Sequence, residues 1–156
     1  MIITQDGGYV VCGSYEIFGY DPHEYENWAF LMKTDSDGNL LWAVDDSLDF
    51  MISNGYQIDF TELPDGSLLS IGYSAFGGGG IYMIKRDSEG NQMWAIPYDN
   101  EFGVFSMKTT SDGNVILAGG SNNNAALRKI NPDGNTIWTS DPSIIDCRIE
   151  TFQFNS

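Results

Sequence analysis

The residues best suited to ligand chemistry form an acidic and aromatic stretch between positions 16 and 27. Its aromatic rings and carboxylates surround His23, the one histidine of the chain. Aromatic planes beside carboxylates suit sugar rings or a basic protein surface, through stacking and charge-assisted hydrogen bonds. The alternative is a structural loop that covers a neighbouring part of the fold. The candidate ligand-binding residues, two of them from a later connection, are Phe18, Tyr20, Asp21, His23, Glu24, Tyr25, Tyr98 and Asp99.

Catalytic chemistry has little support in the residue pattern. A Ser-His-Asp or Cys-His arrangement would depend wholly on His23. That residue lies in the polar segment Tyr20-Asp21-Pro22-His23-Glu24-Tyr25, with no clear nucleophile beside it. We therefore predict no catalytic residues, and a solvated loop histidine.

One acidic segment, Asp35-Ser36-Asp37-Gly38-Asn39, resembles the start of a calcium loop. It lacks the Gly at the sixth position and the Glu at the twelfth position that such a loop needs. Similar acidic turns recur in the chain, and a hairpin explains them without a metal. We predict a hairpin turn and no metal site.

The charge of the chain restricts its partners. Seven Lys and Arg stand against 22 Asp and Glu, for a formal net charge of −15. Such a charge repels phosphate, which excludes nucleic acid and anionic membrane surfaces as partners and leaves cations, basic proteins and neutral sugars. No apolar run approaches the roughly 18 residues of a membrane span, so we predict no membrane insertion. Cys12 and Cys147 could pair, but two cysteines make no disulfide framework and fit no zinc spacing.

Internal repeats predict the strands and turns that position the candidate ligand-binding residues. A Lys, a polar turn with Gly and a Trp recur in fixed register. A second series of turns, each beginning Asp-Gly, precedes each Trp segment. The repeats are spaced by the roughly 40 to 50 residues of a four-stranded propeller blade. The Trp segments are Lys33–Trp42, Lys85–Trp94 and Lys129–Trp138, and the second series is Asp6–Gly13, Asp65–Gly72 and Asp112–Gly119.

We predict an all-β chain, with almost no helix, because Asp-Gly turns separate short apolar runs and no 3.6-residue period is sustained. Three four-stranded antiparallel blades would form one domain. The repeats span about 1–46, 52–98 and 102–141, with a closing strand at 144–154. The middle repeat would place its strands at 55–63, 67–73, 81–85 and 92–96, and the first would keep only 1–4 of its first strand.

Three blades are too few to close a propeller ring, which needs about four to eight. We expect a partial ring that is either half of a six-bladed homodimeric ring or a piece of a longer chain. The N-terminus lacks the regions of a signal peptide, which favours a mature product or such a piece.

The repeated residues receive structural predictions. The tryptophans should pack between neighbouring blades, and the glycines should allow tight turns. The repeated lysines should form surface ion pairs with turn carboxylates and contribute little to stability. The variable stretch 16–27 should be a loop on the opposite edge, where binding is usual. These residues are Trp42, Trp94 and Trp138, Gly38, Gly90 and Gly134, and Lys33, Lys85 and Lys129.

The pattern Lys-x-Asp-x-x-Gly-Asn-x-x-Trp resembles the repeat of quinoprotein-like, PQQ-type propellers. The run Asp6–Ser14 resembles the blades of secreted bacterial propeller proteins. The resemblance implies a propeller scaffold. In the quinone-dependent dehydrogenases of that superfamily, an eight-bladed ring holds the quinone and a calcium ion. This chain has too few blades for that arrangement, so we predict no cofactor.

These observations favour a non-catalytic binding module on a propeller scaffold, with a protein or glycan as ligand. The resemblance and the acidic, aromatic composition place it outside the cell or at the cell surface, the periplasm included. Structural self-assembly through exposed blade edges is the alternative function. A relative of the quinone-dependent oxidoreductases is the third hypothesis.

Overall fold

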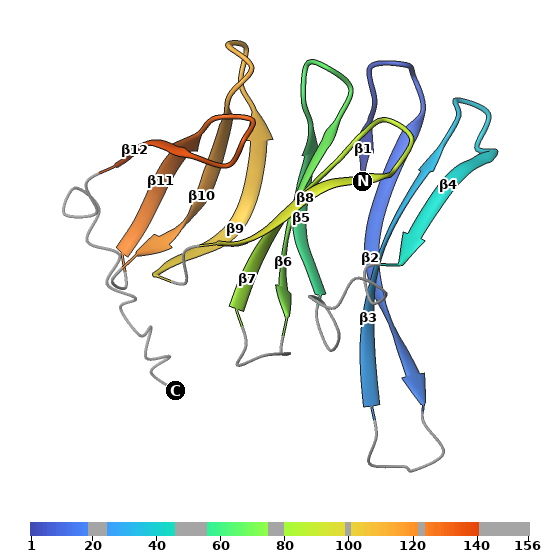
Figure 1. Ribbon diagram of the computed structural model, residues 1–156, viewed down its shortest axis with the longest axis horizontal. Coiled ribbons are helices and arrows are strands. Elements are labelled where there is room, and N and C mark those ends of the chain that lie inside the picture. The colour runs from blue at the N-terminus through green and yellow to red at the C-terminus, as the bar shows by residue number, and fades with distance from the viewer. Residues whose placement is uncertain (19–24, 46–55, 75–79, 99–100, 122–123, 141–156) are drawn as a thin grey trace, which may run out of the picture.

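The computed structural model of the chain describes residues 1–18, 25–45, 56–74, 80–98, 101–121 and 124–140. Its twelve strands form three four-stranded antiparallel sheets, here called blades 1, 2 and 3 (Figure 1). Blade 1 contains β1 (Ile2–Ile3), β2 (Tyr9–Phe18), β3 (Tyr25–Thr34) and β4 (Leu40–Asp45). Blade 2 contains β5 (Tyr56–Glu62), β6 (Leu68–Ser74), β7 (Gly80–Arg86) and β8 (Gln92–Tyr98). Blade 3 contains β9 (Phe102–Thr109), β10 (Val115–Ser121), β11 (Asn124–Ile130) and β12 (Thr136–Thr139).

The predicted fold class is confirmed. The described residues contain no helix, and each blade pairs its strands in chain order as an antiparallel meander. The strands of blade 2 lie where the repeat pattern places them, apart from small shifts at their ends. The three blades stand side by side without closing a ring over the part of the chain that is described (Figure 1). The predicted closing strand at 144–154 lies outside the described residues.

Local turn chemistry explains why each repeat folds into hairpins. In the β3–β4 turn, Gly38 adopts a φ of 86°, a conformation that glycine adopts without steric cost. The Asp35 carboxylate accepts the backbone N–H groups of Asp37 at 2.9 Å and Asn39 at 2.8 Å. The acidic segment is therefore a hairpin turn whose first carboxylate satisfies the backbone of that turn.

Polar contacts between β5 and β9, the first strands of blades 2 and 3, join these two blades. The Asp59 carboxylate on β5 accepts the backbone N–H of Met107 at 2.7 Å and the hydroxyl of Ser106 at 2.8 Å, both from β9. The hydroxyls of Thr61 and Thr109 lie 2.9 Å apart. These bonds hold β9 beside β5 and thereby fix the position of blade 3 relative to blade 2 along these two strands.

The hydrophobic core lies between the blades, as expected for sheets that bury one face against the next. One cluster fills the space between blades 1 and 2, and its buried members are Val10, Leu31, Phe60 and Leu68. A larger cluster fills the space between blades 2 and 3. Its largest fully buried members are Leu63, Leu69, Ile71, Met83, Phe102, Leu117 and Ile130.

The hairpin of blade 1 corrects one expectation. The stretch 16–27 was predicted to be a loop, but β2 continues to Phe18 and β3 begins at Tyr25. Backbone pairing runs through Glu16↔Asn27, Ile17↔Glu26 and Phe18↔Tyr25. Ile, Phe and Tyr favour extended pairing, which explains why the ladder continues. Each of these strands has 10 residues, against 7 in the corresponding strands of blades 2 and 3.

Candidate functional site

The predicted ligand-binding residues centre on the end of the β2–β3 hairpin. Phe18 and Tyr25 are direct cross-strand partners there, at the last described pair of the ladder. The hairpin reaches farther than the β6–β7 and β10–β11 hairpins on the same edge of the molecule (Figure 1). The candidates that lie outside the described residues are Tyr20, Asp21, His23, Glu24 and Asp99.

Tyr98 does not lie with the hairpin. It is the last residue of β8 and is only 7% exposed, in the core between blades 2 and 3. Its hydroxyl accepts a hydrogen bond from Nη1 of Arg128 at 3.3 Å. The guanidinium of Arg128 also lies 4.4 Å from the ring centroid of Phe102. The structure thus corrects the ligand-binding expectation for Tyr98, because a ring packed in the core does not present a face for stacking.

The opposite edge carries the repeated turns and an ion pair in each blade. Lys33 Nζ lies 2.6 Å from Asp6, Lys85 Nζ 3.8 Å from Asp65, and Lys129 Nζ 2.5 Å from Asp112. The side chains of Lys33 and Lys85 are buried, whereas the carboxylates remain about half exposed.

The expectation of surface ion pairs is therefore wrong for the lysines of blades 1 and 2. Their apolar stems can pack between blades while the amines reach the turn carboxylates. Lys33 is buried and lies two residues after Leu31, which belongs to the cluster between blades 1 and 2. Removing the carboxylate would leave a buried ammonium group without this partner.

The ion pair of blade 1 predicts a change in acid stability. Hydrogen bonds from Lys33, Thr4 and the backbone of Gly8 hold the pKa of the Asp6 carboxyl far below its usual 3.8. Because the folded pKa is lower than the unfolded pKa, the contribution is present above about pH 4 and is lost as the pH falls further.

We expect Asp6→Asn to lower the free energy of unfolding at pH 7 by on the order of 1 kcal/mol, since water screens the half-exposed carboxylate. The variant should also lose less stability than the wild type between about pH 4 and pH 2. Urea unfolding at several pH values measures both effects. Parallel acid curves for the two proteins would contradict the assignment.

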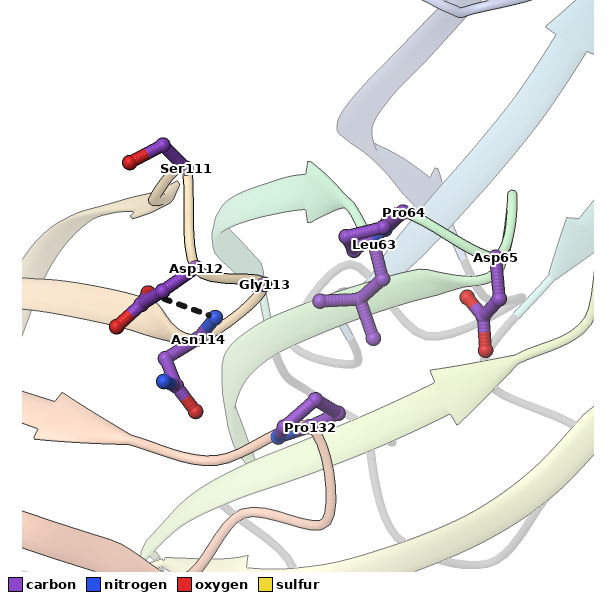
Figure 2. Close-up of a pocket in the computed structure, with 8 residues that line it drawn as sticks. All are labelled: Leu63, Pro64, Asp65, Ser111, Asp112, Gly113, Asn114 and Pro132. Atoms are coloured by element: carbon purple, nitrogen blue, oxygen red, sulfur yellow. Dashed lines mark hydrogen bonds between the residues drawn. The ribbon is translucent and has the colours of Figure 1, made fainter.

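A solvent-open hollow lies at this turn edge, between blades 2 and 3 (Figure 2). Leu63 and Pro64 form one wall, and the Asp112–Asn114 turn and Pro132 form the others. The Asn114 backbone N–H donates to Asp112 at 3.3 Å, and Asp112 already binds Lys129. The carboxylate is thus engaged within the blade, which leaves a mainly apolar surface. The repeated residues of this edge were predicted to be structural, and the hollow was not predicted.

Tryptophans connect blades 1 and 2 to the turn of the blade that follows each of them. Trp42 Nε1 of blade 1 donates to the carbonyl oxygen of Ser88 at 2.9 Å, across the boundary with blade 2. A Cβ on Gly90 would lie 2.8 Å from Cδ2 of the Trp42 ring, so only glycine allows this contact. Trp94 of blade 2 makes the corresponding approach to blade 3, where a Cβ on Gly134 would lie 3.6 Å from its Cη2 atom. We call this Trp-to-turn contact the blade seam.

In the described part of the chain, no three His, Cys, Asp or Glu side chains converge as a metal site would require. No helix among the residues described is long and apolar enough to cross a membrane. Burial raises the pKa of the Cys12 thiol, and Cys147 lies outside the described residues.

No family model and no curated protein matches the chain. Among solved structures, one similar chain is a protein of unknown function from Bacteroides caccae, with 13% sequence identity and a TM-score of 0.45. The alignment covers 74% of this chain and 42% of that chain.

Proposed function

We propose that this protein is a non-catalytic extracellular binding module, whose ligand is a protein or a glycan that docks on the end of the β2–β3 hairpin. The observation that carries the proposal is the extended ladder of blade 1, which ends in the Phe18↔Tyr25 pair. A ladder of ten-residue strands holds this end on a regular scaffold. Binding residues are often found at such projecting ends of rigid folds.

The composition of the hairpin supports the two ligand classes. Aromatic residues at its end suit the faces of sugar rings, and the acidic residues around them suit hydroxyl or basic groups. The net charge of −15 would speed association with a basic protein at low ionic strength. Salt separates the two classes, because screening weakens binding to a basic protein and has little effect on a neutral glycan.

A glycan array and a protein pull-down, each followed by titration, test the proposal. We expect Phe18→Ser combined with Tyr25→Ser to weaken the ligand found by at least about tenfold. The matched control is Leu40→Ser combined with Leu41→Ser, which removes two exposed apolar side chains at the opposite edge. Binding that survives the hairpin substitutions, or an empty result in both assays at millimolar concentration, would refute the proposal.

Structural self-assembly is the second candidate function. It is favoured by the exposed apolar side chains on the outer face of blade 3, which include Leu127 and Trp138. This candidate does not involve the hairpin.

A further inference from the structure

The blade seam joins two different surfaces, a Trp surface on one blade and a turn surface on the next, and a single chain carries both. One half is a Trp with the apolar residues beside it, which covers the next blade. The other half is a glycine turn, which receives the Trp of the preceding blade. Blade 2 presents both halves, because Gly90 receives Trp42 and Trp94 reaches Gly134. Blade 3 has no following blade among the described residues, and blade 1 has no preceding one.

The Trp half of the seam is uncovered on blade 3. Leu31, Met83 and Leu127 occupy the same position before the repeated Lys. Leu31 and Met83 are fully buried against the next blade, whereas Leu127 is 45% exposed. The same contrast holds for the tryptophans, since Trp42 and Trp94 are partly buried and Trp138 is 43% exposed. Blade 3 therefore displays the apolar surface that blades 1 and 2 bury.

The turn half of the seam is uncovered on blade 1. No described atom lies within 4 Å of the position that a Cβ on Gly38 would occupy, although Gly90 and Gly134 are both in contact there. Tyr9 follows the Asp-Gly turn in blade 1 as Leu68 and Val115 do in blades 2 and 3. Leu68 and Val115 are buried, and Tyr9 is only partly buried. Blade 1 thus offers the surface onto which a Trp from another blade would pack.

We propose that a second copy of this chain covers both surfaces. Trp138 of each copy packs on the Gly38 turn of the other copy, and its indole N–H donates to the carbonyl oxygen of Ser36, the counterpart of Ser88. A two-fold axis makes the two contacts equivalent, so two seams form together. Two copies give six blades, which is within the range of closed propellers. This inference gives the second candidate function its partner, and it does not depend on ligand binding by the hairpin.

Charge makes a distinctive contribution to this assembly. Each copy carries a net charge of −15, so the two copies repel each other at low ionic strength. The seam consists of apolar packing and one hydrogen bond between uncharged groups, and salt does not weaken apolar burial. Raising the salt concentration from about 0.05 M to about 0.5 M should therefore strengthen the dimer, because it shortens the Debye length.

Light scattering and sedimentation equilibrium on the full chain test the proposal. We expect a mass twice that of the 17.3 kDa chain, and a single 17.3 kDa species for Trp138→Glu. The matched control is Met93→Glu. Met93 lies on β8 of blade 2, which has a neighbouring blade on each side, and its side chain is nevertheless 56% exposed. It therefore lies outside the contacts between blades, and this substitution should leave the dimer intact. The hairpin variants of the preceding section should also remain dimeric.

A mixing experiment guards against variants that fail to fold. Tyr9→Glu blocks the blade 1 surface and should also give a monomer. A mixture of Trp138→Glu and Tyr9→Glu retains one intact seam, so it should form a heterodimer that neither variant forms alone. A wild-type chain that stays monomeric, a dimer that survives Trp138→Glu, or a mixture that stays monomeric would each overturn the proposal. The first of these outcomes would indicate that residues 141–156 or further blades cover the two surfaces.

Discussion

Gly119→Ala should lower the free energy of unfolding by about 3 kcal/mol, although it adds one methyl group. Gly119 lies on β10 at a shift in the register between β9 and β10. A Cβ there would lie 1.9 Å from the carbonyl oxygen of Gly103 and 3.0 Å from Cε1 of Phe102. The first contact is with backbone, so a side-chain rotation cannot relieve it. The strands β9 and β10 would have to separate at this position.

Gly103→Ala is the matched control for this prediction. It adds the same methyl group to the neighbouring strand, where the nearest atom is the carbonyl oxygen of Gly120 at 3.9 Å. We expect this variant to lie within about 1 kcal/mol of the wild type. Urea unfolding at a fixed protein concentration compares the two variants. Equal losses would show that β9 and β10 do not approach each other as described.

Phe102→Ala should cost about 3 to 5 kcal/mol, the usual range for removing a buried aromatic side chain. Phe102 is fully buried in the cluster between blades 2 and 3. Its ring also supports the guanidinium of Arg128, which lies 4.4 Å from the centroid. The substitution therefore opens a cavity and removes a cation–π contact.

Phe105→Ala provides the control for Phe102→Ala within the same strand. Phe105 also lies on β9 but is 76% exposed, so its removal should change stability by less than about 0.5 kcal/mol. Thermal or urea unfolding distinguishes the two variants. A Phe105→Ala loss as large as that of Phe102→Ala would mean that the buried face of β9 is assigned wrongly.

The fold could be predicted from the sequence because its turns are marked by residue type. Asp-Gly and Gly-Asn segments recur in every blade, and the glycines of these turns adopt positive φ. The lengths of β2 and β3 could not be predicted in the same way. The segment from Tyr15 to Phe18 contains no glycine or proline that would mark the end of a strand. Its aromatic residues are compatible with both a strand and a binding loop, so residue type alone did not decide between the two.

The environment of individual side chains was harder to predict than the strands. Tyr98 precedes the polar residues Asp99 and Asn100, which suggested a surface connection, but a tyrosine at a strand end can be buried when its hydroxyl has a partner such as Arg128. Lys33 was expected to form a surface ion pair with a turn carboxylate, yet its side chain is buried beside the core. Trp138 cannot be distinguished from Trp42 and Trp94 by sequence. Trp138 is more exposed because it lies on blade 3, which no further blade follows among the described residues.

Trp42 and Trp94 should stabilise the boundary with the following blade, whereas Trp138 has no such boundary within one chain, and one parallel measurement tests this difference. The free energy of unfolding would be measured for Trp42→Ala, Trp94→Ala and Trp138→Ala in the Tyr9→Glu background, which keeps a second copy from binding. We expect losses of about 2 to 4 kcal/mol for the first two substitutions and less than about 1 kcal/mol for Trp138→Ala. Three equal losses would contradict the claim, because they would show that the tryptophans act within their own blades.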